Sequence, residues 1–330
     1  MTEKSEDPRC PNRILSSWPQ IAECLGEFPA PRQAIEYDLE DGYPSDEKIS
    51  WVFRGLKSSS YGLQPTIERQ ARFTGWDWSA LEKHVSNEFK ARARMHLSAS
   101  LIPADELSWL ALMQHHAIPT RLLDFTYSPF VALYFAVRAG YEGPARTHVR
   151  LWAVDAEAVK DKCSAWCAQR TAMKEEASRL LPASPDPDDF QTQRDAVVAE
   201  AKNWGEIIEK ALVGTGKFRG ELNRQGCVFA ALPAAANPRL VSQQGVFLFN
   251  CAEDLDFQAS LTKMMKGREA RPGSLRPAVP AWCKTFDISV ELIPEIEKRL
   301  FQMNIHEQSL FPDLEGLAGL IGQKIRLHWK

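Results

Sequence analysis

The sequence of 330 residues lacks the features of a membrane or secreted protein. Its longest apolar segment, around 130–137, is much shorter than the roughly 18 consecutive apolar residues of a membrane-spanning helix. The N-terminal stretch "MTEKSEDPRCPNRILSSW" has no apolar core of a secretory signal. We therefore expect a cytoplasmic protein with no membrane partner.

The common catalytic signatures are also missing. No G-x-S-x-G, H-E-x-x-H or phosphate-binding G-x-x-x-x-G-K-[ST] sequence occurs, and no G-x-G-x-x-G opens a helix. Hydrolase, zinc-protease, NTPase and Rossmann classes are therefore not supported. Seven scattered cysteines favour a reduced chain, and Cys163 with Cys167 has no second ligand pair nearby. No metal is expected.

The composition is that of an ordinary globular protein. Hydrophobic residues make up 44% and charged residues 25% of the chain, and the formal net charge is -3. A sizeable core is possible, and bulk attraction to nucleic acid is not expected. We interpret 1–14 as a flexible N-terminus and 15–330 as a single domain. A segment rich in Ala, Lys, Glu and Gln (156–217) is predicted to be a helical insertion, interrupted by the acidic, proline-rich loop 182–189.

Hydrophobic periodicity predicts strands and helices in an irregular order. Short alternating or buried apolar runs predict strands at 48–56, 120–126, 148–155, 226–233, 244–250 and 283–289. Longer amphipathic or capped runs predict helices at 15–28, 78–97, 103–116, 128–140, 291–304 and 309–325. This mixture of short strands and segregated helices indicates an α+β fold.

The stretch "HHAIPTRLLDFT" (115–126) places charged and titratable groups between two apolar helices. His115, His116, Arg121 and Asp124 lie within ten residues of each other. One interpretation is a buried Arg–Asp network that holds the strand, since a buried charge needs a partner. The other is a polar cluster facing a cleft, with a histidine as ligand donor or general base. We expect Arg121 and one histidine to face the cleft and Asp124 to anchor the turn.

Three weaker groups accompany it. Arg54 ends a predicted strand beside Gly55, where a guanidinium can bind phosphate or carboxylate and the glycine permits close approach of a ligand or another backbone. Gln243 and Gln244 precede a strand and can orient a ligand hydroxyl or satisfy a bulge. Glu88 with Arg92 is either a site or, more simply, a solvated i, i+4 ion pair.

These regions together resemble the FRG domain family. The similarity runs through "WVFRGLKSSSYGLQPTIER" (51–69), "NEFKARA" (87–93), "MQHHAIPTRLLDFTYSPFVALYFA" (113–136), "RLVSQQGVFLF" (239–249) and "SLFPDLEGLA" (309–318). Ala117 stands where the family usually has glycine, and Phe125 where it has tryptophan. Because alanine disfavours left-handed backbone, we do not expect a left-handed turn at Ala117.

The resemblance implies a fold and an activity. FRG domains have been likened to ADP-ribosyltransferases, and some occur in anti-phage defence or toxin contexts. The implied fold is an ADP-ribosyltransferase-like split β-sheet core with flanking helices. The implied substrate is NAD, with a protein or nucleic acid as acceptor. The implied NAD-binding residues are Arg54, Gly55, Arg69, Thr120, Arg121 and Asp124. The implied catalytic candidates are His115, His116, Gln243, Gln244 and Glu88.

One difficulty accompanies this interpretation. The third strand of such a fold often supplies a catalytic glutamate, whereas here Gln243 and Gln244 fall near that place. A glutamine can orient a ribose hydroxyl but cannot act as a carboxylate base. The alternative is therefore a non-catalytic module that binds NAD or another nucleotide, or senses a partner. A nuclease with a histidine acid/base is a third, less favoured hypothesis.

Overall fold

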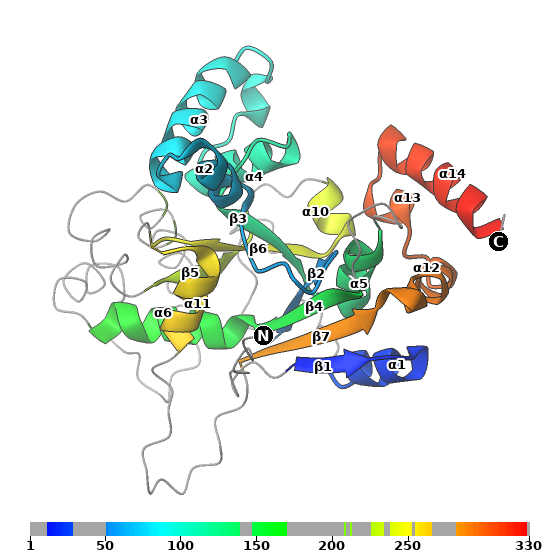
Figure 1. The fold of residues 1–330 in the computed structure, drawn as a ribbon. Coiled ribbons are helices and arrows are strands. Elements are labelled where there is room, and N and C mark those ends of the chain that lie inside the picture. The colour runs from blue at the N-terminus through cyan, green and yellow to red at the C-terminus, as the bar shows by residue number, and fades with distance from the viewer. Residues whose placement is uncertain are drawn as a thin grey trace, which may run out of the picture.

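The computed structural model describes residues 12–28, 51–138, 147–169, 208, 212, 226–233, 238–252, 255–265 and 282–328. Within these ranges seven strands form one mixed sheet in the order β1-β7-β4-β2-β3-β6-β5, drawn in Figure 1. β1 runs parallel to β7, and the other neighbours are antiparallel. The strands are β1 (Asn12–Leu15), β2 (Trp51–Leu56), β3 (Leu122–Thr126), β4 (His148–Asp155), β5 (Val228–Ala231), β6 (Gly245–Asn250) and β7 (Cys283–Ser289).

The six predicted strands are confirmed where the structure describes them, and the α+β class with them. Two details of the prediction are wrong. Residues 12–14, expected in a flexible N-terminus, form most of β1, which adds to the edge strand β7. Arg54 does not end its strand, because β2 continues through Gly55, which pairs with Leu151 of β4, to Leu56.

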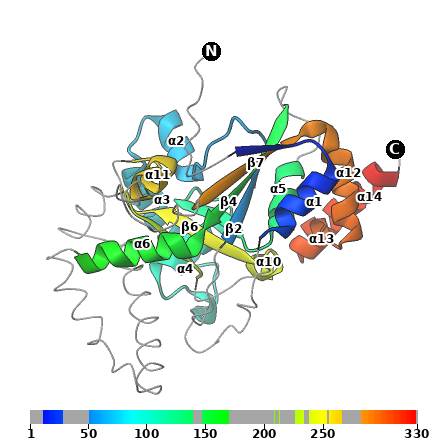
Figure 2. The ribbon, with the colours of Figure 1, turned by 90° about the horizontal axis from the view of Figure 1, so that it is seen from below.

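Helices cover both faces of the sheet, as Figures 1 and 2 show. One face packs against α1 (Trp18–Gly26), α5 (Pro129–Val137) and α12 (Ile293–Gln302). The other packs against α4 (Glu106–His115), α6 (Ala156–Gln169) and α11 (Phe257–Met265). The further helices are α2 (Thr66–Thr74), α3 (Trp78–Ala93), α10 (Pro238–Ser242), α13 (Glu307–Leu310) and α14 (Leu314–His328).

β2 and β3 are the most weakly joined neighbours in the sheet. They share the single registered pair Phe53–Thr126, whereas six residues of β2 pair with β4 and five residues of β3 pair with β6. The two strands therefore diverge directly after Phe53, and their backbone groups beyond this point cannot hydrogen-bond to each other. This interruption leaves room between the two halves of the sheet.

Gly55 lies where helix α5 crosses β2. A Cβ placed on Gly55 would stand 1.9 Å from the carbonyl oxygen of Ala132 and 2.6 Å from the amide nitrogen of Ala136. Both atoms belong to the backbone of α5 and cannot move aside cheaply. The close approach that the glycine permits is therefore that of a helix, the second of the two possibilities that the sequence left open.

Ala117 corrects a sequence-based expectation. Its φ is 58°, so the turn between α4 and β3 is left-handed in spite of the alanine. The Ala117 amide donates to the Gln114 carbonyl (3.0 Å) and the Ile118 amide to the Met113 carbonyl (2.9 Å), which closes the C-terminus of α4. These bonds hold the residue in a conformation that costs an alanine roughly 1–2 kcal/mol.

Replacing Ala117 by glycine is expected to raise the free energy of unfolding by about 1 kcal/mol, because glycine adopts the left-handed region without a steric penalty. Urea denaturation of the two proteins measures the change. Ala80→Gly is the matched control: Ala80 is exposed on α3, and the same substitution in a helix should destabilise by about 0.5–1 kcal/mol. A destabilised Ala117→Gly protein would contradict the strain.

Part of the predicted insertion and several single features can also be placed. Residues 156–169 form α6, whereas most of 170–217, including the acidic loop 182–189, lies outside the described residues.

Cys24, Cys163, Cys227 and Cys251 are free and buried, but Cys283 is disulfide-bonded, which departs from the expectation of a fully reduced chain. Among the described residues, no helix has the length and apolarity needed to cross a membrane.

Candidate functional site

A pocket of about 960 Å³ opens where β2 and β3 diverge. Residues of β2, β3 and β6 line it, together with the loop before α2, α2 itself, α4, α5 with Arg138 at its end, α10, Gln243 and Phe311. Six of the eleven residues proposed from sequence line it, five of them being Arg54, Gly55, Arg69, His115 and Asp124. Gln243 lines it as a sixth, and the remaining five lie elsewhere.

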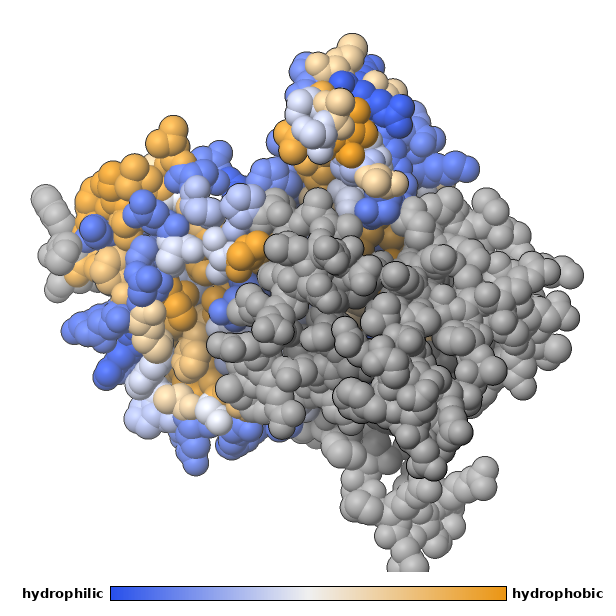
Figure 3. Space-filling view, turned by 180° about the vertical axis from the view of Figure 1, so that it is seen from behind, coloured by the Kyte–Doolittle hydropathy of each residue, from blue (hydrophilic) through white to orange (hydrophobic). Residues whose placement is uncertain are grey.

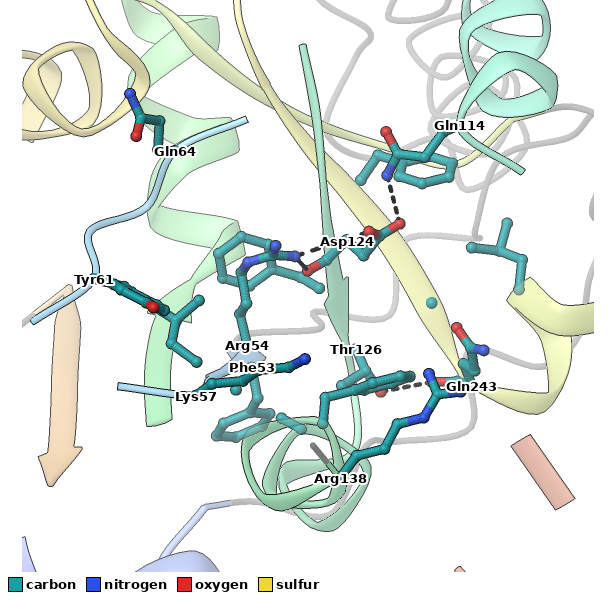
Figure 4. A pocket seen from close by; sticks show the side chains of 18 of the residues that line it. Phe53, Arg54, Lys57, Tyr61, Gln64, Gln114, Asp124, Thr126, Arg138 and Gln243 are labelled. Carbon is teal, nitrogen blue, oxygen red and sulfur yellow. Dashed lines mark hydrogen bonds and ion pairs between the residues drawn. The ribbon is translucent and has the colours of Figure 1, made fainter. Parts of the chain in front are cut away.

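Arg54 bridges the interruption in the sheet, as Figure 4 shows. Its Nη1 donates to the backbone carbonyl of Asp124 on β3 and lies 3.9 Å from the Asp124 carboxylate. The guanidinium therefore supplies the donor that β2 backbone would have given to β3 if the strands had stayed paired. The Nε of Arg54 is buried without a hydrogen-bond partner in the described part of the chain. Desolvation lowers the pKa of Arg54, which Asp124 partly offsets, and arginine remains a cation.

Asp124 presents the pocket's carboxylate. Gln114 Nε2 donates to Asp124 Oδ1 over 2.7 Å, and Gln114 Oε1 accepts from the hydroxyl of Thr120. Because a carboxylate only accepts hydrogen bonds, the Gln114 amide nitrogen must point at Asp124, and the amide oxygen then faces the Thr120 hydroxyl, which donates to it. The Asp124 side chain is 63% exposed, so the carboxylate is oriented by its neighbours yet remains accessible to a ligand. The expectation that Asp124 anchors the turn is therefore incomplete, because Asp124 also lines the pocket.

The pocket lining is strongly cationic. Among the residues that the structure describes, Asp124 is the one acidic residue in the lining. Six lining residues are basic: Arg54, Lys57, Arg69, Arg72, Arg138 and Arg239. Within the described part of the chain, Arg69 donates to the Gln64 carbonyl (2.8 Å) and the Thr66 hydroxyl (3.0 Å) and to no carboxylate. Arg72 lies 3.4 Å from Asp256, and both side chains are largely exposed. Arg69 and Arg72, both on α2, therefore give the pocket positive charge that is only weakly compensated by carboxylates.

The opposite wall holds its arginines more tightly. Arg138 Nε donates to Glu307 over 2.7 Å, and Arg239 donates to Asp313 (2.6 Å) and Glu315 (2.9 Å). Both guanidinium groups lie over the ring of Phe311, at 4.2 Å and 5.4 Å from its centroid. The stacked aromatic ring keeps the two cations at fixed positions on the rim.

His115 and His116 have different positions at the end of α4. His115 lines the pocket, and burial, followed by the charge of Arg239, lowers the pKa of its imidazole. The ring is therefore neutral at pH 7 and able to accept a proton. His116 caps the helix with its backbone amide and packs its ring against Phe89 and His115. His116 does not line the pocket.

Gln243 and Gln244 also separate. Gln243 lines the pocket, but its amide nitrogen donates to the Leu310 carbonyl over 3.0 Å, and its backbone carbonyl accepts from the Thr126 hydroxyl. Gln244 has a φ of 48°, and its carbonyl accepts from the amide of Tyr127. Gln244 does not line the pocket. It forms the turn into β6, the structural role that the sequence left open.

Arg121 and Thr120 do not face the pocket, contrary to expectation. Arg121 is 5% exposed and forms an ion pair with Glu82 of α3, which is 2% exposed. Glu82 also accepts from the Arg121 backbone amide over 2.7 Å, and the guanidinium lies 5.0 Å from the ring centroid of Trp78. The predicted buried ion pair of Arg121 therefore exists, but the partner is Glu82 and not Asp124. Thr120 is fully buried and acts on the pocket through Gln114.

Glu88 is likewise outside the pocket. Its carboxylate lies 2.9 Å from Arg92 one helical turn along α3, and both side chains are mostly exposed. The simpler alternative, a solvated i, i+4 pair, is the one that the structure shows. Glu88 therefore cannot replace the missing strand glutamate.

The structure adds residues that sequence reasoning missed. Gln114 belongs to the family-like stretch 113–136, but the sequence analysis gave it no role. Its position ten residues before Asp124 in the same stretch could have indicated a contact between the two side chains. Lys57 and Tyr61 lie in the loop after β2, within the family-like stretch 51–69, and were given no role there. Arg138 reaches the pocket from the C-terminus of α5, 84 residues beyond Arg54, which no local spacing could indicate.

The fold and the site thus define an α+β protein with a cationic pocket at an interrupted sheet. In a comparison with protein families, residues 49–143 match the FRG domain family. The chain therefore carries an FRG domain over these residues, which contain three of the five stretches on which the resemblance was based. The matched segment contains β2, α2 to α5 and β3, and with them Arg54, Gln114 and Asp124. No curated protein and no solved structure matched the chain significantly.

Proposed function

We propose that the pocket binds NAD and that the protein is an ADP-ribosyltransferase. The observation that carries this proposal is the pairing of Arg54 with Asp124 across the interruption between β2 and β3. It puts a phosphate-binding cation and an accessible carboxylate on the two sides of one cavity. A volume of about 960 Å³ lies at the upper end of small-molecule sites, which suits a dinucleotide.

The cationic side of the pocket suits the pyrophosphate of NAD. Arginine donates in a planar fork that matches phosphate oxygens, and Arg54 and Arg69 reach the cavity from β2 and α2. Tyr61, whose ring is half exposed beside them, offers an aromatic face for a base or the nicotinamide. The same features would bind another nucleotide with two phosphates.

Asp124 supplies the carboxylate that the third strand lacks. In a transfer reaction the bond between ribose C1′ and the nicotinamide nitrogen breaks, and the electron pair leaves with nicotinamide. A nucleophile of the acceptor forms the new bond to C1′. A carboxylate near C1′ stabilises the positive charge that develops on the ribose and can accept the nucleophile's proton. Neutral His115 is the second group in the pocket able to take that proton.

The divergence of β2 and β3 supports the same assignment. An ADP-ribosyltransferase-like core is expected to have a split sheet with NAD in the gap, and the FRG resemblance implies that core. Here the strands part after the pair Phe53–Thr126, with Arg54 as the next residue of β2. We infer that the implied split corresponds to this interruption. The bacterial defence or toxin setting and the protein or nucleic-acid acceptor are proposals of the resemblance alone.

A non-catalytic NAD- or nucleotide-binding module is the second candidate. Gln243, the polar group at the entrance to the third strand, is engaged with the Leu310 carbonyl and is not a carboxylate. If Asp124 serves only to hold Arg54 and Gln114, the pocket would bind without turnover. Binding and turnover must therefore be measured separately.

Calorimetric titration with NAD tests the binding step. Arg69→Ala is expected to weaken NAD affinity about tenfold, because it removes one charged hydrogen-bonding group from the pocket. Arg92→Ala, which removes an exposed arginine of α3 outside the pocket, should leave the affinity unchanged. Failure of the wild-type protein to bind NAD at millimolar concentration would overturn the proposal. Binding without release of nicotinamide would favour the second candidate.

A further inference from the structure

Helix α14 carries an apolar stripe that faces solvent. Leu314 is 82%, Ile321 54% and Ile325 55% exposed, and Leu317 on the same side is 39% exposed. The opposite face of the helix, with Leu320 and Gln323, is buried against the protein. Turning the molecule by half a turn brings α14 to the upper left of Figure 3, where hydrophobic side chains gather on the surface. A contiguous exposed patch of this kind marks an interaction site.

The spacing of the stripe is that of a coiled-coil seam. Leu314, Ala318, Ile321 and Ile325 follow one another at intervals of four, three and four residues. Alternating intervals of three and four keep a seam facing one partner helix over successive heptads. Of the partners an apolar seam could take, the spacing selects a helix that runs along α14.

The charges beside the stripe select a second copy of this chain as that partner. Three consecutive pairs stand eleven residues apart, close to three full turns, so each pair shares one side of the helix. They are Asp313 and Lys324, Leu314 and Ile325, and Glu315 and Arg326. When two α14 helices pack antiparallel, the first residue of each pair in one copy faces the second residue of the same pair in the other copy. Apolar then meets apolar in the seam, and acid meets base on both flanks.

We propose that the protein forms a two-fold homodimer through antiparallel packing of α14. Leu314 packs against Ile325 of the second copy, and Ala318 packs against Ile321 of the second copy. Glu315, whose side chain is 84% exposed, reaches Arg326 of the second copy, and Asp313 reaches Lys324. The opposed helix dipoles add a favourable term. Because the contact is isologous, it closes at two copies and leaves no stripe exposed.

This dimer goes beyond the proposed function and does not depend on it. It does adjoin the pocket, because Asp313 and Glu315 also hold Arg239, one of the pocket's cations. The wall formed by Arg239 and Phe311 therefore stands directly behind the proposed interface.

Sedimentation velocity of the full chain over a micromolar concentration range tests the proposal. Two heptads form a small interface, so we expect a dimer that dissociates at concentrations on the order of micromolar. Ile321→Glu should leave a monomer at every concentration. Phe73→Glu, which puts the same charge at an exposed apolar position of α2, should leave the dimer intact. A monomeric wild-type protein overturns the proposal, as does an Ile321→Glu protein that still dimerises.

Charge reversal distinguishes this pairing from any other helix partner. Glu315→Arg and Arg326→Glu should each weaken the dimer about tenfold or more, because like charges then meet across the interface. In the double variant, residue 315 of each copy again meets an opposite charge at residue 326 of the other copy. This variant should therefore recover most of the affinity. Circular-dichroism melts check that all variants are folded. If the double variant dimerises no better than the single ones, the antiparallel register is wrong.

Discussion

Replacing Asp124 by asparagine is expected to lower the rate of NAD turnover about 10²- to 10³-fold and to change NAD affinity only a few-fold. Asparagine keeps the oxygen that accepts from Gln114, so the local geometry survives. What is lost is the negative charge and the ability to take a proton, each of which acts mainly as the glycosidic bond breaks. Nicotinamide release and transfer of labelled ADP-ribose measure turnover, and calorimetry measures affinity.

Glu88→Gln is the matched control for this substitution. It makes the same change from carboxylate to amide on the exposed side of α3, away from the pocket, and should leave turnover unchanged. If Asp124→Asn binds NAD and turns it over at the wild-type rate, the carboxylate takes no part in the reaction. The pocket would then need another group, of which His115 is the nearest candidate.

Replacing Arg121 by methionine is expected to destabilise the fold by about 3–5 kcal/mol, because it leaves the Glu82 carboxylate buried without its cation. Urea denaturation measures the loss. The double variant Arg121→Met with Glu82→Gln should recover part of it, since a neutral amide can still accept from the backbone amide of residue 121. Such recovery would identify the buried charge as the cause.

The same variants separate stability from binding. Because Arg121 is buried against α3 and does not line the pocket, the folded fraction of Arg121→Met should bind NAD with nearly wild-type affinity. A large loss of affinity at unchanged stability would place Arg121 in the site after all.

The strands and helices were largely predictable because their signals are local. Alternation in 148–155 and the apolar runs of 244–250 and 283–289 are sufficient, since each strand has to bury one or both faces. Ser128 and Pro129 fix the start of α5 by the same kind of local chemistry. β1 was missed because four residues on an edge, two of them exposed, carry no pattern until β7 pairs with them.

The site was harder to predict because its chemistry depends on which face a side chain takes. Arg121 and Asp124 lie three residues apart, and we expected Arg121 to face the cleft and Asp124 to anchor the turn, yet Arg121 is buried against α3 and Asp124 opens to the pocket. The choice depends on Glu82, 39 residues away, which no spacing within the motif reveals. Ala117 shows the opposite limit: closure of a helix end held an alanine where its own preference disfavours it.

The single pair between β2 and β3 has a consequence for how the molecule opens. Elements joined by few hydrogen bonds unfold locally at lower free energy than those in a continuous ladder. Amide hydrogens bordering the interruption should therefore exchange with solvent faster than those between β4 and β7. A ligand that spans the gap contacts both halves of the sheet and closes this route. Slower exchange along β2 and β3 would thus report occupancy directly, whether or not any chemistry follows.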